Sequence, residues 1–294
     1  MNQWLAIVNS HSGGRDNENI ATIGAVRLFT KDVLFSEYPG HARELAASAS
    51  LHRGIVAVGG DGTLLEILNG ADRRRHEIAV LPAGRGNSLA RDLGIATIGA
   101  GLEAIHHGRS VAIDLSEVIL KRSDEFESRV VSASTIAVGY PVVATTLANG
   151  LRRLGKFSYA VAATIASIKL KPEEMTITYD DRLPTRMRLN GLIVSNSRHL
   201  ANFVAFPDAD LSDGYLDLME LLAGPLSQNL RNFSALSGID FCRPAPVRKI
   251  RRIRVGLAKA AAVMIDGEIF KDIRQFEATV APRAVRCRRG ASCG

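Results

Sequence analysis

The chain has 294 residues, which is long for one average domain and short for three, so two domains are expected. Hydrophobic residues make up 46% of it and charged residues 23%, which excludes an intrinsically disordered or a fibrous protein. The formal net charge is +7, and basic residues gather at 248–254 and 283–289. Such clusters favour nucleic acid, an anionic bilayer or a triphosphate as partner, but a solvated strand face explains them equally well.

The first third of the chain alternates short β-branched runs with helical patterns. The expected elements are a strand at Trp4–Val8, a helix at Ala42–Leu51, a strand at Ile55–Val58, a helix opening at Leu64–Leu68 and a strand at Ile78–Leu81. This alternation predicts an α/β domain with a parallel, doubly wound sheet. Ligands of such sheets bind beyond the carboxyl ends of the strands, so the Gly-rich turns that follow the strands are the expected site.

Longer β-like runs begin at about Val111 and predict a β-rich second domain, an antiparallel sandwich or a curled sheet. The runs are Arg129–Val138, Met175–Tyr179, Met187–Ser195, Tyr215–Leu222, Val247–Val255, Ala262–Phe270 and Phe276–Val280, with turns at Asp180-Asp181 and Asp266-Gly267. Helical patterns interrupt them at Pro141–Asn149, Phe157–Ile168 and Leu226–Leu236. We place the boundary at Ile113, which gives domains 1–113 and 114–294, and the last segment could pack back on the first domain.

The strongest local signal is Gly59-Gly60-Asp61-Gly62-Thr63, which lies between a strand and an amphipathic helix. Glycines let the backbone approach a phosphate closely, and the helix N-terminus presents N–H groups to an anion. Asp61 adds a carboxylate for Mg²⁺, and Thr63 is expected to cap the helix and to donate to phosphate. The alternative is a β-turn whose Asp and Thr only cap a helix.

Two further turns have the same character. Gly84-Arg85-Gly86-Asn87 follows the strand at Ile78–Leu81, and Asn9-Ser10-His11-Ser12-Gly13-Gly14 follows the N-terminal strand. Arg85 and Asn87 are potential donors to phosphate oxygens. Three phosphate-compatible turns in consecutive strand-helix units favour a nucleotide site along one edge of one sheet.

Several motifs together resemble the diacylglycerol kinase catalytic family, which includes sphingosine, ceramide and bacterial lipid kinases. The resemblance covers nearly the whole length. AIVNSHSGG is similar to the family's NPxSG segment, SEYPGHARELA to TxxPGHAxxLA, VGGDGTLLEILNG to the GGDGT motif, PDADLSDGYLDL to PxAxxxDGxLD, and MIDGEIF to the closing DGE. The resemblance implies an NAD-kinase-like first domain followed by a β-sandwich, and an enzyme that transfers the γ-phosphoryl group of ATP to a lipid hydroxyl.

The same resemblance implies a role for individual residues. Asp61 would organise catalytic Mg²⁺, and Glu268 would be the general base. A structural Mg²⁺ would be held by the Asp213 carboxylate and by the backbone carbonyls of Asp210 and Tyr215. The residues implied in ATP binding are Asn9, Ser12, Ser36, Gly59, Gly60, Asp61, Gly62, Thr63, Leu64, Leu65, Gly84, Arg85, Gly86 and Asn87.

Two departures from the family pattern affect the expected identity of the lipid acceptor more than the expected reaction. The turn at Gly84–Ser88 is nearer the GSGNA of sphingosine and ceramide kinases than the GTxND of many bacterial diacylglycerol kinases, and Leu200–Phe203 replaces a Gly-rich segment. Both diacylglycerol-like and sphingoid-like acceptors therefore stay open. Without the resemblance, Asp266-Gly267 before Glu268 is simply a good hairpin turn.

Two alternatives remain. One is an NAD kinase, a family that also carries GGDGT, although its paired Asn-Glu motif is not evident here. The other is a catalytically silent lipid-binding regulator that kept the fold, against which stands the joint presence of Asp61, Asp213 and Glu268. A six-carbon sugar-phosphate kinase fits less well.

Partners and location follow from composition. Aromatic residues make up only 5% of the chain and no Lys-rich stripe is present, so no nucleic-acid partner is expected. Cys242, Cys287 and Cys293 show neither metal-ligand nor disulfide spacing, which fits a reducing cytoplasm. The N-terminus lacks a signal-peptide pattern, and the longest apolar run is far below the ~20 residues of a bilayer span. We therefore expect a cytoplasmic protein that contacts an anionic membrane peripherally, and a homodimer stays open.

Overall fold

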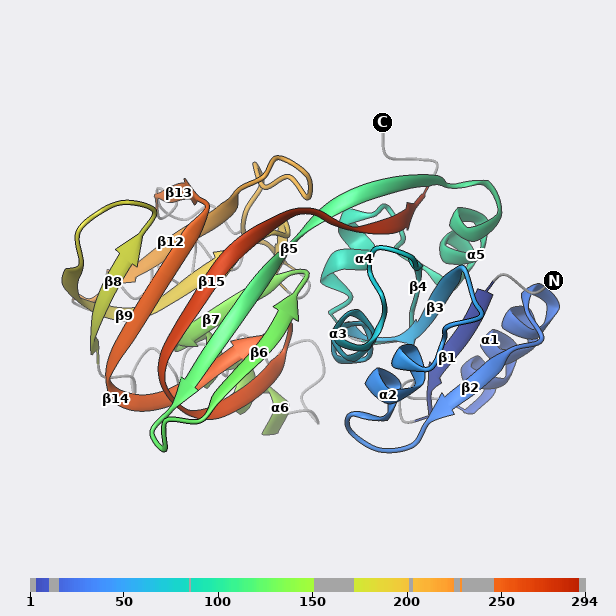
Figure 1. Cartoon of the computed structure of the whole chain (residues 1–294), viewed down its shortest axis with the longest axis horizontal. Helices are drawn as coiled ribbons and strands as arrows, with labels where there is room; N and C mark the ends of the chain where they lie inside the picture. The colour runs from blue at the N-terminus through green and yellow to red at the C-terminus, as the bar shows by residue number, and fades with distance from the viewer. Residues whose placement is uncertain are drawn as a thin grey trace. The chain divides into compact units, whose positions relative to one another are not determined.

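The computed structural model describes residues 4–10, 16–84, 86–150, 172–200, 203–224, 228 and 246–290. The chain divides into two compact units, which are described separately (Figure 1). Unit 1 comprises residues 1–115, 211–213 and 281–294, and unit 2 comprises residues 116–210 and 214–280. The boundary expected from the sequence is a single one at Ile113, whereas the units also group 211–213 and 281–294 with the first 115 residues.

Unit 1 is an α/β unit with a parallel sheet. Its elements are β1 Trp4–Asn9, α1 Asp16–Phe29, β2 Val33–Ser36, α2 His41–Ala47, β3 Gly54–Gly59, α3 Asp61–Gly70, β4 Glu77–Pro82, α4 Ser88–Asp92 and α5 Ile98–His107. The strands pair in the order β4-β3-β1-β2, all parallel. The end of the last strand, β15, adds to β4 in parallel through Arg286 and Cys287.

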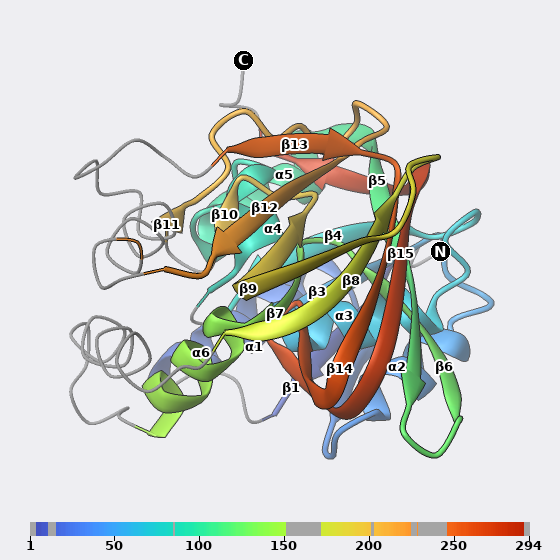
Figure 2. The same cartoon turned by 90° about the vertical axis from the view of Figure 1, so that its left-hand side faces the viewer.

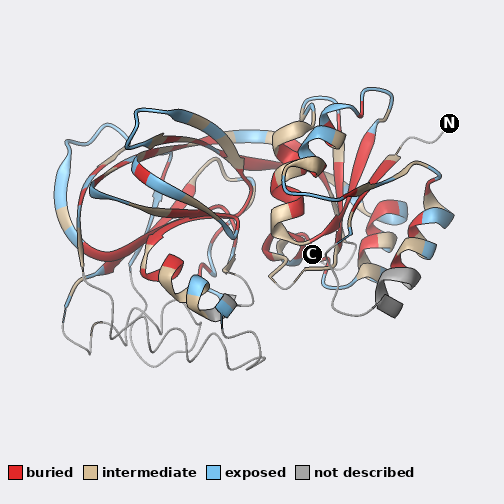
Figure 3. Ribbon diagram, turned by 90° about the horizontal axis from the view of Figure 1, so that it is seen from below, coloured by how far each residue is buried: buried red, intermediate tan, exposed pale blue. Residues whose placement is uncertain are grey.

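The core of unit 1 follows from the two-residue period of its strands, in which alternate side chains point to opposite faces. One face carries Val8, Val58 and Leu81, which pack with Val26 of α1 and Ile105 of α5. Helices α2 and α3 contact each other and the neighbouring strands. The strands are buried along most of their length, as the red ribbons in Figure 3 show. The predicted α/β character is confirmed, and the doubly wound topology stays a prediction.

Unit 2 is built almost entirely of strands. Its elements are β5 Arg109–Arg122, which begins in unit 1, then β6 Glu127–Ser132, β7 Thr135–Gly139, α6 Tyr140–Gly150, β8 Glu173–Tyr179, β9 Thr185–Ser195, β10 His199–Leu200, β11 Phe203–Val204, β12 Leu216–Leu222, β13 Val247–Ile250, β14 Arg252–Ile265 and β15 Glu268–Arg289, which ends in unit 1. The predicted β-rich second part is therefore confirmed.

The strands of unit 2 pair antiparallel in the order β13-β12-β9-β7-β14-β15, with β5 joining β15 to β6. Strands β7 and β8 pair with different parts of the same two neighbours, β9 and β14. Helix α6 packs against β7, β9 and β14 (Figure 2). Its Val142 lies in a buried cluster with Phe206, Met219 and Met264.

Two runs that the sequence analysis treated as single strands are each broken in the structure. Arg129–Val138 is divided into β6 and β7, and Val247–Val255 into β13 and β14. At the second break, the Asp180 carboxylate accepts hydrogen bonds from the backbone N–H groups of Arg251 at 2.8 Å and Arg252 at 3.1 Å. A side chain that takes backbone donors competes with the strand ladder at that point.

Other expectations were incomplete. Helices α1 and α5 and strands β2 and β5 are not among the elements expected from the sequence, and Ile113 lies inside β5. The helical pattern at Phe157–Ile168 lies outside the described residues, as does the one at Leu226–Leu236 apart from Gln228. Within the described part of the chain, no helix combines the length and apolar composition that crossing a bilayer requires.

The cysteine prediction can be examined at one position. Cys287 is a free thiol buried beside β4, where burial and the nearby Glu77 carboxylate raise its pKa to about 12. It is therefore a packing residue and not a reactive thiolate. Cys242 and Cys293 lie outside the described residues.

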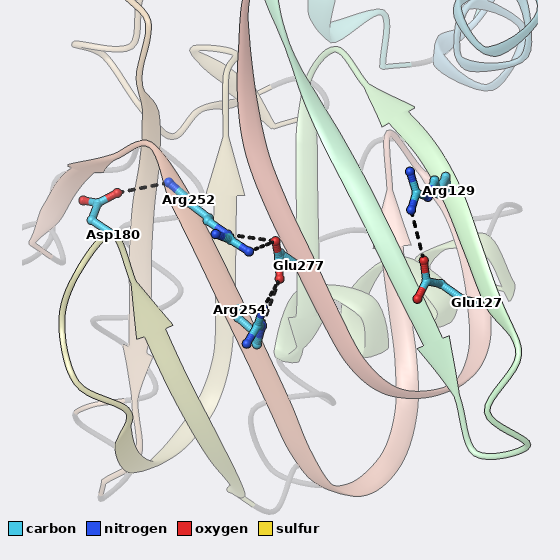
Figure 4. A network of polar contacts seen from close by, with 6 residues as sticks. All are labelled: Glu127, Arg129, Asp180, Arg252, Arg254 and Glu277. Carbon is cyan, nitrogen blue, oxygen red and sulfur yellow. Dashed lines mark hydrogen bonds and ion pairs between the residues drawn. The ribbon is translucent and has the colours of Figure 1, made fainter.

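The basic run at 248–254 is partly neutralised within unit 2 (Figure 4). Glu277 of β15 accepts from Nε of Arg252 at 2.8 Å and from Nε of Arg254 at 2.9 Å. Burial raises the pKa of the Glu277 carboxyl, but these two guanidinium groups outweigh it and hold the pKa below its ordinary value. The folded state is therefore stabilised by the ionised form of Glu277.

We predict that Glu277→Gln lowers the free energy of unfolding near pH 7 by about 1 kcal/mol, since solvent screens the pairs but two hydrogen-bonded cations lose their counter-charge. A depressed folded pKa means that this stabilisation is present above the unfolded pKa and is lost as pH falls through the folded pKa. Urea unfolding at pH 7 and at about pH 3 should show the difference between variant and parent disappearing in acid.

Glu127→Gln is the matched control. Its partner Arg129 lies 3.5 Å away, and both side chains are largely exposed (Figure 4). This variant should unfold like the parent at both pH values. Equal changes for Glu277→Gln and Glu127→Gln would show that Glu277 is no more than a surface charge.

Candidate nucleotide site and acceptor turn

The parallel register of unit 1 brings its strand ends to one edge of the sheet. Asn9 at the end of β1 pairs with Ser36 at the end of β2, and Gly59 at the end of β3 pairs with Pro82 at the end of β4. Two of the turns are linked directly, because Asn9 Nδ2 donates to Thr63 Oγ1 at 3.0 Å. Ser36 is buried, and its carbonyl accepts from the hydroxyl of Ser10 at 2.8 Å.

The turns after β3 and β4 touch backbone to backbone. A Cβ atom added at Gly84 would lie 2.4 Å from Gly60 Cα and 2.8 Å from Asn87 Oδ1, and one added at Gly59 would lie 2.4 Å from Thr63 Oγ1. Only glycine fits at these close approaches. The Ala83 N–H donates to the Gly59 carbonyl at 2.9 Å, which holds the two turns together.

Asn87 completes the second turn. It adopts a left-handed conformation with φ 51°, which asparagine tolerates better than most residues. Its Oδ1 accepts from the Gly84 N–H at 3.1 Å, and its Nδ2 donates to the Gly84 carbonyl at 2.7 Å. Asn87 therefore shapes the loop by bonding to the backbone of Gly84. Its predicted contact with phosphate stays a prediction.

Asp61 and Thr63 occupy the first turn of α3, and here one expectation was wrong. Gly60, not Thr63, is the N-cap residue of α3. Thr63 is buried inside the first turn, where its hydroxyl accepts from Asn9. Asp61 Oδ1 accepts from the Ser88 N–H at 2.8 Å, so this carboxylate joins α3 to the first residue of α4.

The remaining predicted nucleotide residues differ in what they can contribute. Leu64 and Leu65 are buried core residues, and the Leu64 N–H already donates to the Gly60 carbonyl at 3.1 Å. The N–H groups of Asp61, Gly62 and Thr63 belong to the first helical turn, where no intrahelical acceptor is available. Gly86 accepts from Arg91 Nε at 3.0 Å through its carbonyl. Ser12 and Arg85 lie outside the described residues.

Glu66 has a structural role that the sequence analysis did not assign. Its carboxylate accepts from the N–H of Gly40 at 2.8 Å and of Ala42 at 3.1 Å, so it caps the start of α2 from α3. A Cβ atom at Gly70 would lie 2.0 Å from the Arg43 carbonyl oxygen, so the two helices also approach closely at the end of α3. The GGDGT and PGHA segments are thus one structural module.

In unit 2, the predicted turn at Asp266-Gly267 is confirmed. Ile265 of β14 pairs with Glu268 of β15, so the loop has two residues. Both have positive φ, 47° at Asp266 and 90° at Gly267, as a type I′ hairpin requires. Glu268 is the first residue of β15 and is exposed.

The Asp266 side chain was not expected to be more than a turn former, yet it is buried and accepts four hydrogen bonds. The donors are the hydroxyl of Ser132 and the backbone N–H groups of Ala133, Ser134 and Thr135, at 2.7–2.9 Å. Burial raises the pKa of this carboxyl, and the four donors oppose that rise. The same contacts explain why the predicted strand Arg129–Val138 breaks between β6 and β7.

The predicted metal residues Asp210, Asp213 and Tyr215 occur in the segment before β12. Gly214 has φ 78°, which suits a tight turn. The Tyr215 ring lies under the Arg251 guanidinium at 4.9 Å, and its hydroxyl accepts from Arg251 Nη2 at 3.1 Å. Among the described residues, no group of three or more His, Cys, Asp or Glu side chains could hold a metal ion, so a site built largely from carbonyls stays a prediction.

Two family models match the chain. Residues 3–118 match the diacylglycerol kinase catalytic domain. Residues 134–288 match the YegS C-terminal NAD kinase beta sandwich-like domain. Together the two matches contain all the residues that the sequence analysis proposed for the site.

Curated relatives are similar at modest identity. A diacylglycerol kinase of Bacillus subtilis (strain 168) is 27% identical over 238 residues, which is 78% of this chain and 76% of that protein. A diacylglycerol kinase of Staphylococcus aureus (strain JH9) is 28% identical over 183 residues, 60% of this chain and 55% of that protein. The second match thus spans about half of that relative.

Solved structures share the fold. A diacylglycerol kinase from Bacillus anthracis str. Sterne superposes with a TM-score of 0.73 at 16% identity, covering 99% of this chain and 98% of that one. An NAD kinase from Archaeoglobus fulgidus in complex with ATP gives a TM-score of 0.53 at 16% identity, covering 98% and 94%. The motifs, the two units and both family matches agree: the chain belongs to the diacylglycerol kinase catalytic domain family, with a YegS C-terminal NAD kinase beta sandwich-like domain as its second part.

Proposed function

We propose that this chain is an ATP-dependent kinase that transfers the γ-phosphoryl group of ATP to the hydroxyl of a lipid, diacylglycerol-like or sphingoid-like. The observation that carries the proposal is the contact between the Gly60 and Gly84 turns at the carboxyl edge of a parallel sheet. Glycines in two adjacent turns leave room for a polyphosphate to approach the backbone, and the start of α3 supplies N–H groups to it.

The residues present fit ATP and Mg²⁺. The nucleotide would be held by Asn9, Ser36, the Gly59–Thr63 turn and the Gly84–Asn87 turn. The Asp61 carboxylate would hold Mg²⁺. The bound metal would supply neutralisation of the triphosphate charge. The protein's part in such a reaction is mainly to position oxygens, and a rigid pair of turns suits that task.

Glu268 is proposed as the general base, an assignment that comes from the family resemblance of its DGE motif. A carboxylate at an exposed turn can accept the proton of a substrate hydroxyl, whose oxygen then attacks the γ-phosphorus. The cleaved bond is that between this phosphorus and the bridging oxygen, which leaves with ADP. The structural Mg²⁺ on Asp213, Asp210 and Tyr215 is part of the same proposal.

A kinase for a small soluble acceptor is the second candidate, because the NAD kinase structure shares the fold. The two differ in the labelled product. Incubation with labelled ATP, a total lipid extract and, separately, NAD would label a lipid in the first case and a dinucleotide in the second.

We also propose that unit 2 contacts an anionic membrane through a surface that we call the tip surface, formed by Tyr179, Arg182, Leu183, Val247 and Arg248. The guanidinium groups of Arg182 and Arg248 lie 5.2 Å and 4.8 Å from the Tyr179 ring centre. Leu183 is 85% exposed. An exposed apolar side chain between cations suits the headgroup region of an anionic bilayer.

Of the basic run at 248–254, the tip surface includes only Arg248. Arg252 and Arg254 share the Glu277 carboxylate, the Arg251 guanidinium lies over the Tyr215 ring, and Lys249 has Asp217 3.9 Å away. Neither Arg182 nor Arg248 forms an ion pair within the part of the chain that the structure describes. Cytoplasmic location with peripheral membrane contact fits this proposal.

Gly84→Ala should weaken Mg²⁺–ATP binding by at least about tenfold, because the added Cβ would collide with the Gly60 backbone and separate the two turns. Isothermal titration with Mg²⁺–ATP measures the dissociation constant. Gly24→Ala is the control, since nothing lies within 4 Å of its Cβ on α1. An unchanged constant for Gly84→Ala would mean that the paired turns do not bind the nucleotide.

Glu268→Gln should fold, bind ATP with near-parental affinity and lose lipid phosphorylation by about 10²–10⁴-fold, because the amide keeps the shape and removes the basicity. The assay is incubation with labelled ATP and a total lipid extract. Asp61→Asn is the comparison, because it should weaken Mg²⁺–ATP binding as well. Near-parental turnover by Glu268→Gln would mean that a group other than Glu268 accepts the proton of the lipid hydroxyl.

The double variant Arg182→Ala/Arg248→Ala should bind phosphatidylglycerol-containing vesicles about 30-fold more weakly, from about 1 kcal/mol per basic residue. Flotation with anionic and with pure phosphatidylcholine vesicles measures this. Arg74→Ala/Arg75→Ala removes the same charge from exposed positions of unit 1 and should bind like the parent. If both double variants lose vesicle binding equally, the effect comes from net charge alone and not from the tip surface.

A further inference from the structure

We propose that Asp266 is a positioning residue that holds the Glu268 carboxylate in place through a buried hydrogen-bonded anchor. This inference rests on the proposed function, in which Glu268 is the base. Asp266 is two residues before Glu268 in the same turn, and only 6% of it is exposed. It does not touch the reacting atoms in this proposal, and it acts through the turn.

The anchor consists of five hydrogen bonds between one residue and one short segment. Asp266 Oδ1 accepts from Ser132 Oγ at 2.7 Å, from the Ser134 N–H at 2.9 Å and from the Thr135 N–H at 2.8 Å. Its Oδ2 accepts from the Ala133 N–H at 2.8 Å. Its own N–H donates to the Thr135 carbonyl at 2.8 Å.

The segment that Asp266 binds, residues 132–135, also forms hydrogen bonds with Ser195 and Asn196. The Ser134 carbonyl accepts from the Asn196 N–H at 2.8 Å and from Ser195 Oγ at 3.3 Å. Thr135 Oγ1 and Ser195 Oγ lie 3.4 Å apart, and both residues are buried. Strand β7, which begins at Thr135, pairs with β14 and with β9. The turn is thus tied to the interior of the sheet and not only to its own hairpin.

A general base gains from such an anchor because its position must be reproducible. Catalytic groups need to be held within roughly 0.5 Å, and a displacement of about 1 Å can cost about 10²-fold in rate. Glu268 is exposed at the first residue after a two-residue turn, where a hairpin frays most easily. A carboxylate suits the anchor better than an amide, because all four contacts on its oxygens are from donors.

The test is a double-mutant cycle with Asp266→Asn and Glu268→Gln. Asparagine tolerates the φ of 47° but places an NH₂ group against backbone donors. Asp266→Asn alone should lower kcat for labelling of a total lipid extract by at least about tenfold, with the ATP dissociation constant unchanged. In the Glu268→Gln background the same change should have almost no further effect, because the group that it positions is no longer a base.

Three controls separate positioning from stability. Ile253→Val removes buried volume from β14 away from the turn and should keep kcat even where it lowers the Tm. Ser132→Ala removes one of the four donors and should lower kcat less than Asp266→Asn, while Ser132→Thr keeps the hydroxyl and should restore it. Amide hydrogen exchange of Ala133 and Glu268 should become faster in Asp266→Asn, independently of activity.

The outcomes are distinct. If Asp266→Asn lowers turnover by the same factor with and without Glu268, its role is structural, and this inference is overturned while the proposed function stands. If exchange and kcat of Asp266→Asn both equal those of the parent, the anchor does not position the turn. If the parent labels no lipid, the proposed function fails and this inference fails with it.

Discussion

The candidate site depends on one steric constraint, the backbone contact between the turns after β3 and β4. Gly60 and Gly84 lie so close that a Cβ atom on Gly84 would fall 2.4 Å from Gly60 Cα. The contact forms because β3 and β4 are parallel neighbours whose register ends at Gly59 and Pro82. The start of α3, the Asp61 carboxylate and the Asn87 loop are all placed by that pair of turns.

A second principle recurs through both units: motif carboxylates accept hydrogen bonds from the backbone of a distant segment. Asp61 binds the Ser88 N–H, Glu66 caps α2, Asp180 binds the N–H groups of Arg251 and Arg252 at the break between β13 and β14, and Asp266 binds the turn between β6 and β7. Such contacts satisfy donors that would otherwise be left without acceptors when strands and helices end. They also fix the geometry of the turns that carry the candidate site.

The basic side chains of unit 2 also fall into two groups, according to the groups that they contact. Arg252 and Arg254 of β14 both donate to the Glu277 carboxylate of β15, so these two cations join neighbouring strands of unit 2. Where arginines lie on an aromatic ring beside an exposed leucine, as at Tyr179 and Leu183, they remain available to an anionic surface. Net charge therefore says little until the partners of each cation are known.

The sequence by itself determined the class of the protein and most of the elements around the site. The strand before Gly59, the strand before Pro82 and the hairpin at Asp266-Gly267 were predictable because hydrophobic period and glycine placement are local properties. Several motifs together, GGDGT the strongest among them, indicated the family. Tertiary structure alone decided that Gly60, not Thr63, caps α3, that Glu66 caps α2, and that Asp266 anchors its turn from a buried position. The roles of Glu66 and Asp266 depend on partners far along the chain, 24 residues away for Glu66 and 134 for Asp266, and no local pattern encodes which backbone donors the fold brings to a carboxylate.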